Sequence, residues 1–312
     1  MATIKEVADR AGVSVGTVSH VITGSVPVSD ALRERVQAAI RELDYHPNHV
    51  ARSLKTSRTR TLGIVVPDLT ISFYPQIIHG AETAAGERGY SLIAVNSAES
   101  ARRQRELISL LRSQQVEGIL LVIAAEPTPS SEMSRLIEAG IPVVCLDRVP
   151  EGVPVDSVSV DDVAAAEMGT DHLIARGYRR IAIRTGPLHL ANEMRRVEGY
   201  RRSLARAGLA AVEEGADALL CTNGPAALAA LRALRDRGLK TPRDIGFVTF
   251  DELTVEDLFQ PAITTVVQPA YEIGRRAAGI LLDRIEGVAP AEGAITVRLP
   301  AVLKIRESSR SV

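Results

Sequence analysis

The stretch from residue 3 to residue 24, TIKEVADRAGVSVGTVSHVITG, decides how the N-terminal part of this 312-residue chain folds. Thr3 and Glu6 have the T-x-x-E spacing of a capping box, in which each side chain satisfies a free backbone N–H at the start of a helix. Residues 11–13 predict a tight turn, after which Ser14 caps a second helix. Two short helices joined by a turn that contains glycine predict a helix-turn-helix, whose second helix lies in the major groove of DNA.

The helical pattern continues past this motif. Ser29 stands where it can cap a third helix. Four apolar residues recur there at helical spacing and close a small core: Leu32, Val36, Ile40 and Leu43. An ordinary helical bundle at the start of an enzyme explains these apolar stripes equally well, but it does not explain the charge. Residues 1–60 carry nine Lys and Arg against six Asp and Glu, a net +3, whereas the remainder carries 28 against 32, a net −4. Positive charge gathered at one end predicts binding to the phosphates of duplex DNA, where cations displace counterions.

Other features limit the class of protein. No apolar run reaches the roughly 18 residues that span a bilayer, and the N-terminus lacks a charged-then-apolar signal pattern, so we expect a cytoplasmic protein. Cys145 and Cys221 end apolar strand-like runs and are expected to be reduced core residues. His46 and His49 lie three apart without a Cys or carboxylate cluster beside them, so neither a metal nor a cofactor is expected. No phosphate loop or nucleophile elbow predicts an enzyme.

From Leu62 onward, continuous apolar runs alternate with helical patterns. The first group predicts buried parallel strands at residues 62–66, 91–95, 118–123 and 142–146. Helix-like stretches lie between them, near residues 76–88, 101–114 and 131–139. After Asp161 the pattern restarts, with strand-like runs at 181–184, 218–221, 246–250 and 263–267. This alternation predicts two doubly wound α/β lobes that face each other and bind ligand beyond the carboxyl ends of their strands.

The sequence resembles the LacI/GalR family of bacterial transcription regulators over nearly its whole length. The resemblance is carried by T-I-K-E-V-A-D-R-A-G-V-S-x-x-T-V-S-x-V, by L-x-Y-x-P-N-x-x-A-R-S-L and by T-L-G-I-V-V-P-D. It resumes with V-E-G-I-L-L, R-x-x-G-Y, R-x-R-G-L-K-T-P-x-D-I-G-F-V-T-F-D and I-T-T-V-V-Q-P. These motifs in this order imply an N-terminal all-α helix-turn-helix headpiece. They also imply an α/β core of two doubly wound parallel-sheet lobes, like the periplasmic binding proteins.

The resemblance also implies domain boundaries. Residues 1–60 form the DNA-binding headpiece, with a hinge helix at residues 48–55, and residues 61–312 form the core that binds effector and dimerises. Within the core, the first lobe is expected at about 61–160 and 269–295, and the second at about 161–268 and 296–312.

Particular headpiece residues match the DNA contacts of the family. Val15 and Gly16 open the recognition helix, but Gly16 has no side chain, and Val15 offers only apolar contact, for example to a thymine methyl group. His20 stands where many members have Arg and can still read a base edge. The alternative for each is a plain solvent-facing position on a helix. The expected DNA contacts are Thr3, Ser14, Val15, Gly16, Thr17, Ser19, His20, Asn48, Ala51, Arg52, Leu54 and Lys55.

The segment at residues 48–55 matches the hinge helix, which pairs with its copy in a dimer. The resemblance implies that Leu54 enters the minor groove as an apolar wedge, with Ala51 and Arg52 beside it. Such a wedge partly unstacks a base step and kinks the duplex, so the flexibility of the central step is read without hydrogen bonds. The alternative for Leu54 is a small apolar anchor onto the body of the protein.

The residues just after the predicted strand ends are the expected effector contacts. They are Asp68, Phe73, Tyr74, Asp147 and Arg148 in the first lobe, and Asn192, Arg196, Asn223 and Asp251 in the second. By resemblance, Arg196 and Asp251 match effector contacts of the family, and a guanidinium facing a carboxylate suits a polyhydroxylated ligand. Phe73 or Tyr74 is placed to stack on a sugar or base. The alternatives are a structural Arg–Asp pair and a core or lid aromatic.

One departure from the family lies between Gly208 and Ala216, where a strand and a helix of roughly two dozen residues are missing. In a sheet of order 2-1-3-4-5 this unit is edge strand 2 with its helix. The pairing of residues 181–184 with 218–221 survives, because the helix expected at 193–207 still supplies the crossover. We expect the new edge and the uncovered sheet face to be exposed to solvent or to a partner. Asn223-Gly224-Pro225 also lacks the carboxylate that the family usually carries there.

Two interpretations of function remain open. The favoured one is a dimeric, sequence-specific transcriptional regulator, most often a repressor in this family, which binds a palindromic operator and is controlled by an effector in the inter-lobe cleft. A sugar is the expected effector, and a purine-like compound is the alternative. The purine-like compound is disfavoured because Leu190 and Cys221 offer neither a hydrogen-bond donor nor an aromatic ring in the second lobe. The other interpretation is a constitutive DNA-binding regulator with a degenerate, non-sensing lobe. Dimerisation follows because one short recognition helix reads few base pairs, and a tetramer stays open.

Overall fold

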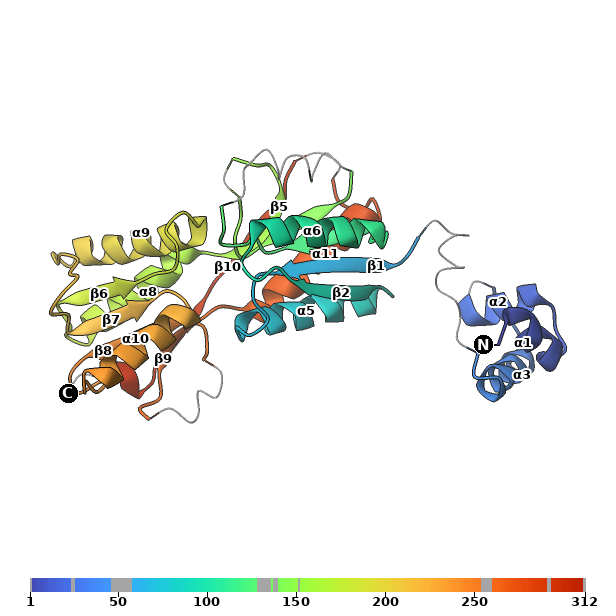
Figure 1. The fold of residues 1–312 in the computed structure, drawn as a ribbon, viewed down its shortest axis with the longest axis horizontal. Helices are drawn as coiled ribbons and strands as arrows, with labels where there is room; N and C mark the ends of the chain where they lie inside the picture. The colour runs from blue at the N-terminus through green and yellow to red at the C-terminus, as the bar shows by residue number, and fades with distance from the viewer. Residues whose placement is uncertain are drawn as a thin grey trace. The chain divides into compact units, whose positions relative to one another are not determined.

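The computed structural model describes residues 2–23, 26–45, 58–127, 136, 140–150, 152–253, 260–290 and 293–310. The chain divides into two compact units, with the boundary between Thr59 and Arg60 (Figure 1). The sequence had placed this boundary at residue 60. None of the described helices is long and apolar enough to cross a membrane.

The described part of the first unit contains three helices: α1 (Ile4–Ala11), α2 (Val15–Thr23) and α3 (Asp30–Glu42). Their apolar faces meet in a small core made of Val7, Ala8, Ala11, Val18, Val36 and Ala39. The predicted capping box is present, since the Thr3 N–H donates to Glu6 Oε2 at 2.7 Å and the Glu6 N–H donates to Thr3 Oγ1 at 3.3 Å. Ser29 precedes α3, but its side chain makes no capping hydrogen bond, so its predicted role as a side-chain cap is wrong.

The second unit begins with a six-stranded parallel sheet of order β10-β5-β4-β3-β1-β2. Its strands are β1 (Thr61–Val66), β2 (Ser91–Asn96), β3 (Gly118–Leu121), β4 (Val143–Leu146), β5 (Asp156–Val160) and β10 (Thr296–Leu299). Helices α5 (Phe73–Glu87) and α11 (Ala270–Ile285) pack together on one face, and α6 (Ala101–Ser113) covers the other, where Ile108 and Leu111 join the core. We call this assembly lobe 1.

Lobe 2 is built on a five-stranded sheet of order β11-β9-β8-β7-β6, in which only β11 is antiparallel. Its strands are β6 (Ile181–Arg184), β7 (Ala218–Cys221), β8 (Gly246–Phe250), β9 (Thr264–Val267) and β11 (Val302–Lys304). Helices α8 (Asp162–Ala175) and α9 (Ala191–Arg206) pack against each other, and α10 (Gly224–Asp236) contacts β6, β7 and β8. A short 3-10 helix, η2 (Glu307–Ser309), ends the described chain.

The expected loss of one edge unit is confirmed. Residues 207–217 connect α9 directly to β7 without a helix or strand, so β6 forms the edge of its sheet. The corresponding strand of lobe 1, β1, has β2 on its outer side.

Two expectations about the strands need correction, and three strands were missed. Residues 91–95 form a parallel strand, but it is an edge strand whose residues are exposed or half-buried. Residues 296–299 form β10, which pairs with β5, so they belong to lobe 1 and the chain returns to lobe 2 only at β11. Strands β5, β10 and β11 were not predicted, because their polar residues interrupt the apolar runs. Most of the helix expected at 131–139 lies outside the described residues.

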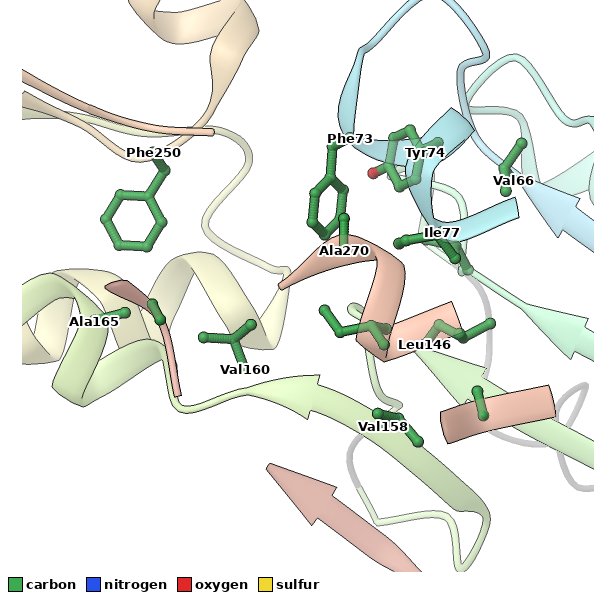
Figure 2. Close-up of a cluster of buried hydrophobic side chains, with 14 of the residues drawn as sticks. Val66, Phe73, Tyr74, Ile77, Leu146, Val158, Val160, Ala165, Phe250 and Ala270 are labelled. Atoms are coloured by element: carbon green, nitrogen blue, oxygen red, sulfur yellow. The ribbon is translucent and has the colours of Figure 1, made fainter. Parts of the chain in front are cut away.

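Apolar packing is continuous along the second unit. Figure 2 shows side chains such as Leu146 and Val158 of lobe 1 followed by Val160, Ala165 and Phe250 toward lobe 2. Cys145 and Cys221 are buried and unpaired, as expected, and burial raises the pKa of each thiol to about 12. Both cysteines are therefore inert core residues.

Candidate functional site

A cavity of about 340 Å³ lies between lobes 1 and 2, within the roughly 300–1,000 Å³ typical of ligand pockets. We call it the cleft. It lies beyond the carboxyl ends of the parallel strands, where doubly wound sheets bind their ligands. The structure brings all nine predicted effector contacts to its wall: Asp68, Phe73, Tyr74, Asp147, Arg148, Asn192, Arg196, Asn223 and Asp251.

The two lobes each place a carboxylate in the wall of the cleft. Asp147 follows β4 with a φ of 57°, and Asp251 follows β8 with a φ of 63°. The Asp147 N–H donates to Val158 O at 3.0 Å, and the Asp251 N–H donates to Val266 O at 3.1 Å. Each carboxylate is thus turned out of its strand by a left-handed residue, a conformation that Asp and Asn tolerate better than most side chains.

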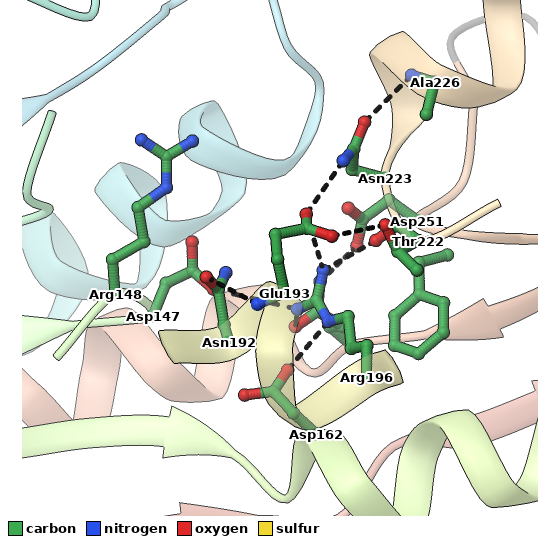
Figure 3. A network of polar contacts seen from close by, with 12 residues as sticks. Asp147, Arg148, Asp162, Asn192, Glu193, Arg196, Thr222, Asn223, Ala226 and Asp251 are labelled. Carbon is green, nitrogen blue, oxygen red and sulfur yellow. Dashed lines mark hydrogen bonds and ion pairs between the residues drawn. The ribbon is translucent and has the colours of Figure 1, made fainter. Parts of the chain in front are cut away.

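Arg196 of α9 is the centre of a buried polar network (Figure 3). Its Nε donates to Asp162 Oδ1 at 2.8 Å, its Nη1 to Thr222 O at 2.6 Å and its Nη2 to Gln268 Oε1 at 3.0 Å. Its guanidinium carbon also lies 4.5 Å from the centroid of the Phe250 ring. All three nitrogens are engaged, so the guanidinium is held in one orientation.

Glu193 supplies a carboxylate beside Asn223-Gly224-Pro225, where this chain lacks the carboxylate that the family usually carries. Its Oε1 accepts from Asn223 Nδ2 at 2.8 Å, and its Oε2 accepts from Thr222 Oγ1 at 2.5 Å. Asn223 also caps α10, because its Oδ1 accepts from the Ala226 N–H at 2.8 Å. Glu193 Oε1 is 4.0 Å from Arg196 Nη1, so this carboxylate belongs to the same network.

Arg148 forms the corresponding contact in lobe 1. Its Nη1 and Nη2 donate to the two carboxylate oxygens of Glu99 at 2.8 and 3.0 Å, and Nη1 also donates to Ile123 O at 3.0 Å. Its Nε is buried and has no partner among the described residues. An oxygen atom of a ligand in the cleft is the natural acceptor for this N–H.

Burial of several carboxylates around one guanidinium changes their acidity. Burial is the largest cause of the rise in pKa of Asp162 and Asp251 to about 6, and the charge of Arg196 opposes that rise. The pKa of Asp147 is raised for the same reason. Desolvation therefore outweighs attraction to Arg196, and these carboxylates favour any ligand that brings hydrogen-bond donors.

The charge of the cleft limits what it can hold. Five acidic residues line it: Asp68, Glu99, Asp147, Glu193 and Asp251. Among the described lining residues two are cationic, and both already bind a carboxylate, Arg148 that of Glu99 and Arg196 that of Asp162. An anionic ligand would be repelled by these carboxylates, and neither described arginine is unpaired to attract it. The hydroxyl groups of a neutral ligand can donate hydrogen bonds to the carboxylates.

The two aromatic candidates are mostly used in packing. Phe73 and Tyr74 are 6% and 3% exposed, and their rings meet edge to face with centroids 5.4 Å apart (Figure 2). Both belong to the apolar core and also line the cleft. They offer ring edges or a small part of a face to a ligand rather than an open stacking platform.

Five polar residues around the cleft were not predicted. Glu99 follows β2, Thr222 follows β7 and Gln268 follows β9, so the strand-end rule that found the others could have found all three. Glu193 and Asp162 lie in α9 and α8, and the rotation of these helices brings the two side chains to Arg196. No local sequence signal marks them.

The lobes also contact each other directly. Ser72 Oγ donates to Glu252 O at 2.8 Å, and Asn192 Nδ2 donates to Asp147 Oδ1 at 3.5 Å. His189 Nε2 hydrogen-bonds to Ala125 O. These contacts lie around the cleft, so a ligand that binds there is placed to change how the lobes meet.

The headpiece presents the start of α2 to solvent. Gly12, with a φ of 64°, ends α1, and Ser14 Oγ accepts from the Thr17 N–H at 3.1 Å to begin α2. Val15 is 43% exposed, and Ser14, Gly16 and His20 are also exposed, while Val18 is fully buried. The predicted base-reading residues therefore lie on the open side of a helix whose other side closes the core.

The other described candidates are less open. Thr17 and Ser19 are half-buried, and Thr3 is exposed while its hydroxyl takes part in the capping box. The predicted hinge contacts lie outside the described residues: Asn48, Ala51, Arg52, Leu54 and Lys55. His46 and His49 lie outside them as well, and no cluster that could hold a metal ion occurs among the residues that the structure describes.

Comparison with known proteins covers nearly the whole chain. Family models match residues 3–48, as bacterial regulatory proteins of the lacI family, and residues 59–217, as periplasmic binding proteins and sugar binding domain of the LacI family. The HTH-type transcriptional repressor PurR of Vibrio atlanticus is 35% identical over 92% of each chain. A transcriptional regulator CelR–cellobiose complex is 33% identical over 99% of this chain and 100% of that one, with a TM-score of 0.72. The lac repressor dimer bound to operator and the anti-inducer ONPF is 26% identical over 99% of each chain, with a TM-score of 0.85.

Proposed function

The chain belongs to the LacI family of bacterial regulatory proteins, and from this membership we propose that it represses transcription as a dimer on a palindromic operator, under the control of a neutral sugar. Its relatives are DNA-binding transcriptional repressors rather than enzymes. Acting on the bacterial chromosome, it would work in the cytoplasm.

The exposed start of α2 is the observation that supports operator binding. The buried Val18 fixes the rotation of the helix, so Val15, Gly16 and His20 face outward together. A recognition helix reads bases through its N-terminal residues. Because Val15 and Gly16 offer little hydrogen bonding, we assign much of the operator preference to the deformability of the central base step.

Leu54→Ala tests this division of labour. We expect it to weaken binding to the operator much more than binding to random duplex, because only a specific complex is kinked by the wedge. The operator is first identified by selecting duplexes that bind the full chain. Fluorescence anisotropy titrations with the operator and with random duplex then measure the two affinities. Equal loss on both would remove Leu54 from the wedge role and leave it as an apolar anchor.

The exposed edge of lobe 1 supports a dimer. Strand β2 has a neighbour on one side only, and Ile93 on it is 37% exposed. Leu110 of α6 is 49% exposed. Apolar residues on an open strand edge favour association with a second copy.

The charge of the cleft supports a neutral, polyhydroxylated effector. Hydroxyl groups can donate to Asp147, Glu193 and Asp251, and a ring or hydroxyl oxygen can accept from Arg148 Nε. A sugar phosphate would instead bring a dianion to a cleft with excess carboxylate. A purine-like ligand lacks an open aromatic face to stack on, since Phe73 and Tyr74 are packed in the core.

Thermal unfolding of the full chain against neutral sugars, sugar phosphates and nucleobases tests the effector. A ligand that binds only the folded state raises the unfolding midpoint by mass action. A saturable rise with a neutral sugar, lost in Glu193→Gln, supports the proposal. A rise with a sugar phosphate alone contradicts the assigned charge class. No rise with any compound, together with DNA affinity that no compound changes, favours the constitutive regulator.

A further inference from the structure

The loop between β6 and α9 reaches from lobe 2 to lobe 1. His189 of this loop hydrogen-bonds through its ring Nε2 to Ala125 O, and because a carbonyl oxygen can only accept, the ring nitrogen is the donor. The neighbouring Pro187 and Leu190 line the cleft, whereas His189 is not among its described lining residues. We call the His189–Ala125 hydrogen bond the latch, because it joins the two lobes at the rim of the cleft.

The acceptor of the latch is fixed to the wall of lobe 1. The Ala125 N–H donates to Glu99 Oε2 at 2.6 Å, and the same carboxylate accepts from both terminal nitrogens of Arg148. The Glu126 N–H also donates to Glu99 O at 3.2 Å. Ala125 thus has its N–H bound to the polar wall of the cleft and its carbonyl bound to the other lobe, so the latch and Arg148 are tied to one carboxylate.

Three segments connect the lobes and set the axis about which they can rotate. They lie between β5 and α8, between β9 and α11, and between β10 and β11. Within the sheet of lobe 2, β9 and β11 are neighbours at one edge, and β6 forms the opposite edge. His189 follows β6, so it comes from the strand that is furthest in the sheet from the two strands that carry crossovers.

A second contact between the lobes lies next to a crossover. Ser72 Oγ of lobe 1 donates to Glu252 O of lobe 2 at 2.8 Å. Both residues line a small cavity together with Val267, Gln268 and Ala270, which belong to the connection from β9 to α11. The Ser72 contact is therefore close to the rotation axis, and the latch is far from it.

Rotation of the lobes affects the two contacts differently. It separates two atoms in proportion to their distance from the axis, and a hydrogen bond is lost once its donor and acceptor are more than about 3.5 Å apart. A small opening therefore breaks the latch, while the Ser72 contact can persist. His189 is exposed, so its hydrogen bond replaces one to water and changes the ratio of closed to open lobes only about fivefold. That is enough to favour closure and little enough to permit opening.

We propose that His189 is a positioning residue, which holds the two lobes closed across the rim of the cleft through the Ala125 carbonyl. This inference rests on the proposed effector cleft and describes how the chain controls access to it. His189, Ala125 and Glu99 all belong to the chain itself, so the latch also acts in the free protein. An effector enters when the latch opens, and it is retained when the latch closes again.

The distance between the lobes of the full chain tests the proposal. Spin labels are attached at Arg102→Cys of α6 and Glu198→Cys of α9, two exposed positions on different lobes, while the buried native cysteines stay unlabelled. Labelled chain is mixed with excess unlabelled chain, so that only distances within one copy contribute. Double electron–electron resonance should show that His189→Ala raises the ratio of open to closed distances about fivefold.

Three further variants separate the latch from other causes. His189→Gln places an amide N–H near the position of Nε2 and should restore the wild-type distances. Leu188→Ala changes a 55% exposed neighbour in the same loop and should have no effect. Ser72→Ala removes the hydrogen bond beside the crossover and should shift the distances much less than His189→Ala.

Two results overturn the inference. One is a His189→Ala variant with wild-type distances, and the other is a His189→Gln variant that opens as far as His189→Ala, since the hydrogen bond would then not be the cause. The measurement needs no effector. Its failure would leave the proposed sugar site in place, and a sugar panel without any binding would leave the latch in place.

Discussion

Lobe 1 and lobe 2 have the same kind of fold, but they differ in the number of helices and strands between two corresponding strands of their sheets. Between β1 and β3, lobe 1 inserts α5, β2 and α6, whereas lobe 2 passes from β6 through α9 directly to β7. Yet both lobes deliver a left-handed aspartate to the cleft, Asp147 after β4 and Asp251 after β8. The comparison teaches that lobe 2 does not need an edge unit to form its side of the cleft, because Asp251 and the Arg196 network come from inner strand ends and from helices α8 and α9. In lobe 1 the edge strand β2 still leads to Glu99 in the cleft wall.

The lobes differ most in how they hold their charges. Arg196 of lobe 2 is 2% exposed and lies within 4.0 Å of three carboxylates, while Arg148 of lobe 1 is partly exposed and forms its ion pair with one carboxylate, that of Glu99. The shortened lobe thus concentrates its polar interactions at the cleft. The loss of the edge unit leaves the network around Arg196 intact, because no residue of 207–217 contributes to that network.

The largest effect is expected from Arg196→Met. Removal of the guanidinium leaves Asp162 and its neighbours buried without their cation, which should cost about 3–5 kcal/mol of folding free energy. Arg148→Met, its counterpart in lobe 1, should cost less because solvent reaches its partner Glu99. Urea denaturation of both variants measures the difference. Equal losses would mean that the two lobes hold their charges in the same way.

The helix pairs of the two lobes offer a second test. A Cβ at Gly80 of α5 would lie 1.9 Å from Tyr271 O, and one at Gly199 of α9 would lie 2.2 Å from Val163 O. Both are backbone atoms that cannot move aside, so Gly80→Ala and Gly199→Ala should each destabilise by about 1–3 kcal/mol.

Gly279→Ala is the matched control, because a Cβ there meets nothing within 4 Å. Alanine in that helix should stabilise by up to about 1 kcal/mol. Thermal unfolding compares the three variants. A Gly199→Ala variant that is as stable as the control would contradict this expectation. It would show that α8 and α9 can move apart, which means that lobe 2 is loosely packed without its edge unit.

The third test uses pH. The folded-state pKa of Asp251 is about 6, above its ordinary value near 3.8, so the folded state binds more protons than the unfolded state between these limits. Stability should therefore fall as the pH rises from about 4 to about 6 and then level off.

Asp251→Asn should remove part of this slope and stabilise the protein at pH 7 by about 1–2 kcal/mol, because the buried charge is gone and Asn also tolerates the left-handed backbone. Asp147→Asn in lobe 1 should act in the same direction. Unfolding midpoints at pH 5 and pH 7 measure the slope. A variant with the full wild-type slope would place the titration on other groups.

The smallest effect is expected at the bare edge of lobe 2. Tyr200 Oη donates to Ile181 O at 2.7 Å, a backbone carbonyl of edge strand β6. Tyr200→Phe removes this donor and should cost about 0.5–1.5 kcal/mol. Chemical denaturation measures the loss. The comparison is Tyr90→Phe of lobe 1, where the Tyr90 hydroxyl donates to Glu117 Oε2 at 3.2 Å. No loss of stability would mean that water donates to the Ile181 carbonyl as well as the Tyr200 hydroxyl does.

The sequence by itself determined a large part of this protein. The capping box, the turn at Gly12 and the cationic N-terminus indicated the headpiece, and the apolar runs located eight strands. The rule that ligands bind beyond strand ends brought nine residues to one cavity wall. The sequence also showed that the second lobe lacks an edge unit, because a missing stretch of chain is visible in the spacing of motifs.

Only the tertiary structure decided which charges are engaged and which surfaces are open. Glu193 and Asp162 were not predicted because the rotation of a helix against its neighbours, rather than any local pattern, aims their side chains at Arg196. Strand β2 was expected to be buried, but its place at the sheet edge exposes it. Periodicity is a local property of the chain, whereas pairing order, burial and ion pairing depend on residues far apart in sequence. These set both the charge of the cleft and the open sheet edge at β6.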